Sequence, residues 1–352
     1  MNTMEDKKNQ IVYKEMKASD IAELSDARTL YTVDFRAISE NMTYDIPAMF
    51  KYENLMPWVL QGQHVCVNNQ TLPAYKNKNN LLYVPMSSDS RHSIYKRLHD
   101  VVTPDHIQNL HVCIPHPDAE ILAKEKGWTF NATYSDYLAW NDKILQKKYF
   151  GEQTPAWELL TENTPARKDI YIKRRQGSGG FTLYTPSDLS DENVWSKIDH
   201  NHDWYIEQCK EGLSCSVQVY KCNESTFTVF GFSHQLIEDH KFFSGAILQP
   251  LNRILPKHRE QIDALIHKVS NHIQHYVGFL GLDFILSDDG KIWALELNIR
   301  MTAMTIPTLL FNEMPKGRTA AFMEDVMTRH TDDLVLTGLP TGEMDVLRFL
   351  NA

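Results

Sequence analysis

Hydrophobic and polar positions along this chain first follow a mixed pattern and then a strand-rich one. In the first part, short apolar runs at His64–Val67, Leu81–Val84 and His111–Ile114 predict strands. The stretches Ser93–Val102 and Asp118–Lys126 have helical periodicity. Strands that alternate with helices predict a small parallel sheet. No GxGxxG motif follows any of these strands, so the signature of a dinucleotide site is missing.

The pattern changes after Trp140. A polar triplet, Asn141-Asp-Lys143, precedes a helical stretch, Lys143–Phe150, and a turn-rich segment, Gly151–Pro155. Polar and turn-forming residues between periodic segments are typical of a connection. We therefore place a domain boundary here.

Beyond Asp169 the pattern is strand-rich, with one long helix inside it. The predicted strands are Ile170–Arg175, Trp204–Gln208, Ser214–Lys221 and Thr226–His234. Pro256 begins a helix that we expect to reach about Tyr276. Its apolar stripe consists of Ile262, Leu265, Ile266, Val269 and Ile273. Such a stripe indicates a helix face that packs on a core.

Composition narrows the classes of function. The 352 residues carry a net charge of −9, and 42% of them are hydrophobic, which predicts two or three globular domains. The negative charge argues against nucleic acid or an anionic membrane as the main partner. Met1–Gln10 is polar, with no signal peptide or spanning helix behind it, so we expect a cytoplasmic protein. Five cysteines without a CxxC pair are typical of reduced thiols.

The most informative segment is a predicted β-hairpin. Its strands, Gly281–Leu286 and Lys291–Arg300, are joined by the turn Ser287–Gly290. If the four turn residues set the register, Asp283 lies opposite Ala294 and one diagonal step from Glu296.

Alternate side chains of a strand point to the same face, which gives this hairpin an apolar and a polar side. The apolar side carries Leu282, Phe284, Leu286, Trp293, Leu295, Leu297 and Ile299. The polar side carries Asp283, Glu296, Asn298 and Arg300. Two carboxylates and an amide oxygen repel one another unless a cation lies between them, and such oxygen ligands favour Mg²⁺ over zinc or copper. Alternatively, this side is a solvated face whose acids pair with surface lysines.

A lysine and a glycine-rich loop form a second candidate site. Lys173 lies on a predicted strand that runs into Gly177-Ser-Gly-Gly180. Backbone N–H groups of such a loop can approach phosphate oxygens, and the lysine adds a positive charge nearby. The loop is not a Walker A motif, because no GK[ST] follows it. The alternative is a simple turn.

Taken in order, these segments resemble the motifs of the ATP-grasp superfamily. The matching positions are Asn141-Asp-Lys143 with Thr154-Pro155, Ile172-Lys173 with Gly177–Gly180, Ile206–Cys209 with Gly212, Gly281–Asp283, and Glu296–Arg300. The resemblance covers residues 141–305. It implies an α/β chain of α+β lobes with the ATP-grasp fold: a Rossmann-like N-terminal pre-ATP-grasp domain at residues 1–140, a central lobe at 141–205 and a C-terminal lobe at 206–352.

The resemblance also implies a role for each matching residue. The ATP phosphates would contact Lys143 and Lys173, under a closing loop of Gly177, Ser178, Gly179 and Gly180. The hinge that meets adenine corresponds to Glu207, Gln208 and Cys209, and the ribose contact to Ser214 or Glu211. Asp283, Glu296 and Asn298 would hold Mg²⁺, or Mn²⁺ in its place. Catalytic roles are implied for Lys173 and for Arg300, which would stabilise the acyl phosphate.

The activity that the resemblance implies is that of an ATP-dependent carboxylate–amine ligase. Such an enzyme forms an amide or peptide bond through an acyl phosphate and releases ADP and phosphate. The substrates would be a small carboxylate and an amine, such as amino acids or a peptide, and many relatives form homodimers. Leu282 stands where D-alanine–D-alanine ligases have arginine, which argues against that activity. A kinase or carboxylase with the same nucleotide site, and a non-catalytic ATP-binding regulator, are the alternatives.

Two other segments contain residues of metal-binding types. They are Asp199-His-Asn-His-Asp203 and the pair of Cys113 and His116. Neither has a second ligand pair at helical or zinc-ribbon spacing. We interpret both as polar loop segments.

Overall fold

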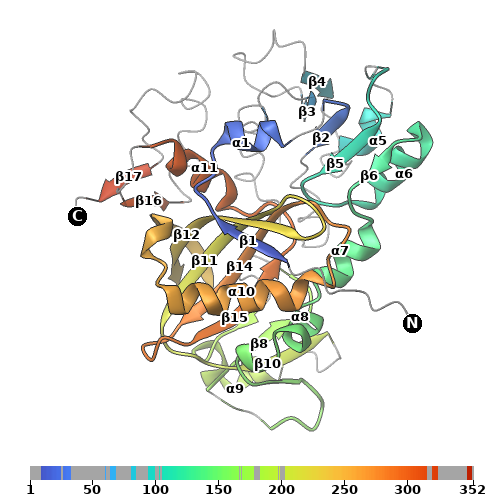
Figure 1. Ribbon diagram of the computed structural model, residues 1–352. Coiled ribbons are helices and arrows are strands. Elements are labelled where there is room, and N and C mark those ends of the chain that lie inside the picture. The colour runs from blue at the N-terminus through green and yellow to red at the C-terminus, as the bar shows by residue number, and fades with distance from the viewer. Residues whose placement is uncertain are drawn as a thin grey trace, which may run out of the picture.

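The computed structural model places three sheets in the chain (Figure 1). The residues that it describes are 9–24, 27–32, 60, 64–68, 81–84, 94–99, 103, 105–165, 167, 169–177, 183–196, 198, 203–314, 319–323 and 347–350. Within these ranges the sheets have five, eight and four strands. Figure 1 shows the five-stranded sheet at the top, the eight-stranded sheet in the middle and the four-stranded sheet at the bottom.

The five-stranded sheet is parallel throughout, which confirms the prediction from alternating strands and helices. Its order, β4-β3-β2-β5-β6, is the order found in doubly wound sheets. The elements are α1 (Ala18–Glu23), β2 (Thr29–Thr32), β3 (His64–Asn68), β4 (Leu81–Val84), α5 (Ile94–Leu98), β5 (Asn109–Val112), α6 (Pro117–Lys126) and β6 (Thr129–Phe130). The strand predicted at 111–114 lies earlier, because Cys113 and Ile114 already belong to the bend before α6.

The eight-stranded sheet carries the largest core. Its order is β15-β14-β11-β12-β13-β16-β17, and β1 pairs with β12 in parallel. The strands are β1 (Gln10–Tyr13), β11 (Leu213–Lys221), β12 (Thr226–Glu238), β13 (Phe242–Gln249), β14 (Gly278–Leu286), β15 (Ile292–Asn298), β16 (Thr319–Met323) and β17 (Leu347–Leu350). The main cluster of buried apolar side chains lies between β11, β12, β14, β15 and the helix α10 (Pro256–Ser270).

The apolar stripe of α10 faces this core, as predicted. The helix itself ends at Ser270, earlier than the expected end near Tyr276. The hydroxyl of Ser270 donates to the carbonyl of His267 at 2.8 Å, and polar residues that bond to nearby backbone in this way weaken a helix. Ile273 and Tyr276 still pack into the same cluster from the turns that follow.

The four-stranded sheet is antiparallel and has a small core of its own. Its order is β7-β10-β8-β9. The elements are β7 (Trp157–Leu159), β8 (Ile170–Arg174), β9 (Leu183–Tyr184), η3 (Asp188–Ser190), α9 (Glu192–Trp195) and β10 (Trp204–Gln208). β10 runs across the boundary predicted between residues 205 and 206, and it pairs with β8 on both sides of that point. The division of the chain into domains stays a prediction.

The hairpin of β14 and β15 forms as predicted, but the predicted register is wrong. Asp283 lies directly opposite Glu296, and not opposite Ala294. Two features cause the shift: Lys291 belongs to the turn, and Leu295 is the extra residue of a β-bulge in β15. The two carboxylates are therefore closer partners than the alternating pattern indicated.

The bulge also changes which side chains of β15 face the core. Ala294 and Leu297 belong to the buried cluster, whereas Trp293 and Leu295, which were predicted for the same side, do not. Leu295 lines a cavity instead. An extra residue shifts the alternation of a strand by one position, so the prediction fails on one side of the bulge.

Helices connect the parallel sheet to the rest of the molecule. They are α7 (Tyr134–Trp140), α8 (Lys143–Phe150) and η2 (Gly151–Gln153), while η4 (Leu251–Arg253) and α11 (Thr305–Glu313) flank the large sheet. In the part of the chain that the structure describes, no helix has both the length and the apolar character needed to cross a bilayer. The cytoplasmic location stays a prediction.

Candidate functional site

One cavity of about 640 Å³ is lined by both the four-stranded and the eight-stranded sheet. The predicted site residues that line it are Lys143, Lys173, Glu207, Gln208, Ser214, Asp283, Glu296, Asn298 and Arg300. Gly177 and Cys209 do not line it. Ser178, Gly179 and Gly180 lie outside the described residues. The fold thus brings most of the predicted residues together from four separate segments of the chain.

The acidic side of the cavity is built on β14 and β15. Asp283 accepts hydrogen bonds from the side-chain amides of Gln235 and Asn298, both at 3.1 Å. The side chain keeps partial exposure to the cavity but lies deep among protein atoms. Burial, together with the charge of Glu296 on the neighbouring strand, raises the pKa of Asp283 to about 6, although Ser216, Arg300 and Lys143 oppose the rise. This carboxylate is therefore incompletely neutralised by its protein neighbours.

Arg300 follows Glu296 and Asn298 in the chain and is 9% exposed. Its guanidinium donates to Oδ1 of Asn298 at 2.7 Å and to the carbonyl of Met301 at 3.2 Å. The hydroxyl of Tyr137, from α7, also bonds to it. A guanidinium held by several partners presents a fixed fork of donors, which suits a carboxylate or a phosphate group.

Lys143 is the first residue of α8, and its side chain reaches the acidic side of the cavity. Its Nζ lies 3.3 Å from Oε2 of Glu296. Asp142 caps the helix by accepting from the backbone of Ile144 and Leu145, and it also pairs with Arg175. The cap fixes the start of α8, so the position of Lys143 follows from the local sequence.

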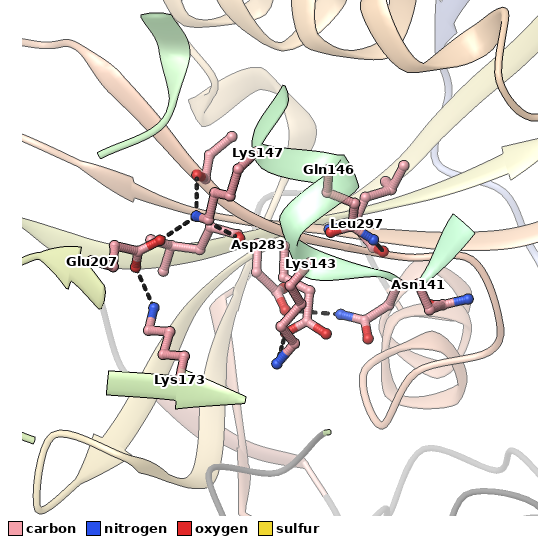
Figure 2. A network of polar contacts seen from close by, with 12 residues as sticks. Asn141, Lys143, Gln146, Lys147, Lys173, Glu207, Asp283 and Leu297 are labelled. Carbon is pink, nitrogen blue, oxygen red and sulfur yellow. Dashed lines mark hydrogen bonds and ion pairs between the residues drawn. The ribbon is translucent and has the colours of Figure 1, made fainter. Parts of the chain in front are cut away.

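A second charged group lies on the side of the cavity formed by β8 and β10. The buried carboxylate of Glu207 forms ion pairs with Lys173 and with Lys147 (Figure 2). Burial alone would raise the pKa of Glu207, but the two lysines outweigh burial and hold the pKa below its usual range. Burial lowers the pKa of Lys147 to about 8, against the effect of Glu207. This carboxylate is neutralised within the protein.

The residues predicted to form the hinge have different surroundings. Gln208 is exposed, its side chain accepts from Lys210, and its backbone N–H donates to the carbonyl of Ala156 at 2.9 Å. Cys209 is half-buried and is not in a disulfide. Ser214 donates to the side chain of Gln235 at 2.8 Å. Their predicted contacts to adenine and ribose stay predictions.

A salt bridge joins the two sides of the cavity near the tip of the β12–β13 hairpin. Nζ of Lys241 lies 3.0 Å from a carboxylate oxygen of Asp188 in η3. His240, Lys241, Phe242 and Phe243 of this hairpin line the cavity. The hairpin therefore forms part of the cavity wall.

The two other segments with residues of metal-binding types do not form a metal site in the described residues. Asp199–His202 lies outside the described residues. The ring of His116 accepts from the backbone N–H of Asp118 and stacks on Tyr95, which is the role of a helix cap. Within the described ranges, no group of three or more histidine, cysteine, aspartate or glutamate side chains could hold a metal ion. The candidate ligand set in the cavity has two carboxylates and one amide.

Three residues that support the site were not predicted from the sequence: Lys147, Ser216 and Gln235. Lys147 is fully buried, three residues after Ile144 and three before Phe150, on the same buried stripe of α8. A lysine on such a stripe is a usable signal, because a buried charge needs a partner. Ser216 and Gln235 lie on strands whose pairing brings them to Asp283, and no motif marks them.

The geometry limits the chemistry of the cavity. Lysines and an arginine are arranged around it for an anion with several oxygens, and two adjacent carboxylates are available for a cation. A phosphate-bearing ligand with a divalent cation satisfies both sets of charges. No nucleophilic serine or cysteine is required for such chemistry.

Comparisons with known proteins agree with this geometry. Residues 140–304 match a family model described as the ATP-grasp domain. Endospore coat-associated protein YheD of Bacillus subtilis (strain 168) is 23% identical over 195 residues. These residues are 42% of this chain and 43% of that protein, so the match spans less than half of the relative's length.

Two solved structures illustrate the fold. One is the biotin carboxylase domain of 2-oxoglutarate carboxylase from Hydrogenobacter thermophilus, in complex with MgADP, ADP and bicarbonate, with a TM-score of 0.56 and 15% identity over 92% of this chain and 72% of that chain. The other is an L-amino acid ligase from Bacillus licheniformis, with a TM-score of 0.53 and 11% identity over 83% of this chain and 78% of that chain. At these identities the likeness shows the fold alone.

Proposed function

Because this chain carries an ATP-grasp domain at residues 140–304, as its motifs predict, we propose that it is an ATP-dependent carboxylate–amine ligase. One observation carries the proposal: two lysines, an arginine, two carboxylates and an asparagine amide gather on a single cavity. Solved structures with a similar fold include a ligase, carboxylases and synthetases. The residues that line the cavity can be assigned to binding of the nucleotide, binding of the cation and catalysis, as follows.

In this proposal the ATP phosphates bind between Lys143 and Lys173. Each lysine has a carboxylate partner, Glu296 for the first and Glu207 for the second, which holds it in place before the nucleotide arrives. The loop at 177–180 closes over the phosphates, and residues 207–209 meet adenine through backbone groups. Closure excludes water, which would otherwise hydrolyse a reactive acyl phosphate.

Asp283, Glu296 and Asn298 fit Mg²⁺, or Mn²⁺ in its place. The fit rests on the donor set: Asp283 lies directly opposite Glu296. Burial and the charge of Glu296 raise the pKa of Asp283 even though Arg300 and Lys143 act against the rise. Oxygen ligands of this kind suit hard divalent cations. When bound, such an ion neutralises charge on the phosphate oxygens. Asn298 shares its oxygen with Arg300, so the ligand set and the arginine are coupled.

The reaction that these residues support has two steps. A carboxylate oxygen of the acid attacks the γ-phosphorus of ATP, the bond from this phosphorus to the bridging oxygen breaks, and ADP leaves. An amine nitrogen then attacks the carbonyl carbon of the acyl phosphate, loses a proton, and displaces phosphate to give the amide. Arg300 stabilises the negative charge that develops on the acyl phosphate, while the lysines hold the nucleotide.

The proposal is tested by incubating the protein with MgATP and pools of amino acids. We expect ADP, phosphate and a condensed product in equal amounts, measured by coupled phosphate release and mass spectrometry. ATP turnover that yields a phosphorylated acid and no free phosphate would assign a kinase instead. Nucleotide binding without turnover, with every acid and amine tried, would assign a regulator.

A carboxylase is the second candidate, because one neighbour with the same fold binds bicarbonate together with MgADP. In that case the acid is bicarbonate, and carboxyphosphate takes the place of the acyl phosphate. Labelled bicarbonate in the same incubation separates the two activities. Label found in an organic product, assayed at alkaline pH because N-carboxylated products lose CO₂ in acid, would favour the carboxylase over the ligase.

A further inference from the structure

The strand β15 lies at an end of the large sheet, yet side chains occupy its open edge. An edge strand exposes backbone N–H and C=O groups that need partners. β14 pairs with one side of β15, and no strand of the described sheet pairs with the other. From Ala294 onward the partners on that other side come from the segment that contains α8, and Gln261 of α10 binds the start of the strand.

Gln146 binds the middle of this edge. Its side-chain amide donates to the carbonyl of Leu297 at 2.6 Å and accepts from the N–H of the same residue at 2.9 Å. Gln146 is 1% exposed and also donates to the carbonyl of Trp140 at 2.7 Å. Asn141 accepts from the N–H of Ile299 at 3.2 Å. Figure 2 shows Gln146 beside Leu297. A glutamine thus pairs with β15 as a neighbouring strand would.

Lys147 and Thr154 bind the bulge of the same strand. Nζ of Lys147 donates to the carbonyl of Leu295 at 3.0 Å and to that of Ala294 at 3.4 Å. The hydroxyl of Thr154 donates to the carbonyl of Ala294 at 3.0 Å. A bulge leaves carbonyl groups without ladder partners, and these two side chains supply the missing donors. The lysine and the threonine also bond to each other at 2.9 Å.

We propose that Gln146, Lys147 and Thr154 are positioning residues for the cation site, because they hold β15 in its bulged register. This inference rests on the proposed function, in which β15 supplies two cation ligands. Leu297 lies between those ligands, Glu296 and Asn298, so fixing its N–H and C=O fixes the directions of both neighbouring side chains. The bulge carbonyls lie immediately before Glu296 and set the point at which the alternation shifts.

The chain offers a matched control at the other end of the same strand. Gln261 accepts from the N–H of Ile292 at 2.9 Å and donates to the carbonyl of Gly290 at 3.0 Å. It therefore makes the same kind of amide contact to backbone, but beyond the bulge and away from the cation ligands. Gln146→Met and Gln261→Met each remove three side-chain hydrogen bonds to backbone groups, with little change in side-chain volume.

The experiment measures binding of Mn²⁺ in the presence of ADP by electron paramagnetic resonance of the free ion. We expect Gln146→Met to raise the dissociation constant about 10-fold, the size typical of losing a partner that orients a ligand. Gln261→Met should leave it within about twofold of the wild-type value. Hydrogen exchange of β15 provides a second readout: the amide of Leu297 should lose protection only in Gln146→Met. Equal weakening of Mn²⁺ binding in both variants would overturn the proposal.

The outcomes also separate this inference from the proposed function. If the wild-type protein binds Mn²⁺ with ADP and Gln146→Met binds it equally well, the positioning role is wrong and the proposed function stands. If the wild-type protein binds no Mn²⁺, the cation site is wrong, and the positioning role is wrong with it. If Gln146→Met does not fold, Thr154→Val replaces it, because it removes one donor to the bulge with almost no change in shape. We then expect a rise in the dissociation constant of the same sign, and an unchanged value would overturn the proposal.

Discussion

Glu207 and Asp283 are carboxylates on opposite sides of one cavity, and their pKa values shift in opposite directions. In both residues, burial by itself acts to raise the pKa. Glu207 has two lysines in direct contact, which outweigh burial. Asp283 has another carboxylate, Glu296, as its cross-strand neighbour, so the effect of burial is reinforced.

The difference shows that burial alone does not tell which acid is available to a ligand. The carboxylate on β10 is satisfied by the protein and holds two lysines in place. Of the carboxylates on β14 and β15, Glu296 has Lys143 as an ion-pair partner, with Nζ 3.3 Å from Oε2. Buried acids whose environments shift their pKa values apart have different roles, and the second pair has the capacity to bind a cation.

The largest expected effect comes from removing an acid on the β15 side. Glu296→Ala should lower ATP turnover by at least about 1000-fold, because the phosphate charge loses its counterion, while the fold stays intact. ADP release measures the turnover, and circular dichroism measures whether the fold is intact. Glu158→Ala, at an exposed glutamate of β7, is the control. Wild-type turnover in Glu296→Ala would refute the cation assignment.

Removing a lysine on the other side should have a smaller effect. Lys173→Ala should reduce turnover or nucleotide binding about 100-fold, because the phosphates lose one of their two lysines while Lys147 still neutralises Glu207. Nucleotide titration and single-turnover kinetics measure it. Lys148→Ala, on the exposed face of α8, should behave as wild type. Equal behaviour of the two variants would move Lys173 out of the site.

Neutralising Glu207 tests the first half of the comparison directly. Glu207→Gln leaves two lysines facing each other, which should lower the melting temperature by roughly 10 °C at pH 7.5, since breaking a buried ion pair costs about 3–5 kcal/mol. The lowered pKa of Glu207 means that its contribution is present at neutral pH and is lost as the pH falls through the folded-state value. The difference between variant and wild type should therefore shrink in acid. A melting temperature that does not change at pH 7.5 would contradict this account.

The smallest effect should have the opposite sign. Asp283→Asn removes a charge that the folded state disfavours, so without divalent cations it should raise the melting temperature by roughly 2–4 °C at pH 7.5. The pKa is raised from 3.8 to about 6, so the destabilisation exists above this range and disappears as the pH falls below it. Thermal melts at pH 7.5 and in acid check both points. A lower melting temperature at pH 7.5 would mean that the lost hydrogen bonds outweigh the charge.

Much of the fold was predictable, because long periodic segments carry strong signals. The parallel sheet, the stripe of α10 and the hairpin of β14 and β15 all follow from alternation or from helical spacing. The bulge at Leu295 was not predictable, since it depends on donors from Lys147 and Thr154 that lie far away in the sequence. The pattern of residues within one strand does not indicate hydrogen-bond donors that are distant in sequence and come close only in the folded protein.

The candidate site divides in the same way. Asp283, Glu296, Asn298 and Arg300 were found because a motif places them on one face of two strands, and the structure does bring them together. Gln235 was missed as a partner of Asp283, because its place follows from the pairing of three strands. The loop at 178–180 lies outside the described residues, so its role stays a prediction.

The pairing of β1 with β12 has a consequence for how the protein is made. Gln10 aligns with Thr226, so β1 leaves the ribosome long before its partner strand exists. By contrast, the five described strands of the parallel sheet have all been synthesised once residue 130 has emerged. The parallel sheet can therefore fold during translation, whereas the sheet that bears the acids is completed late, and contacts so distant in sequence slow its formation.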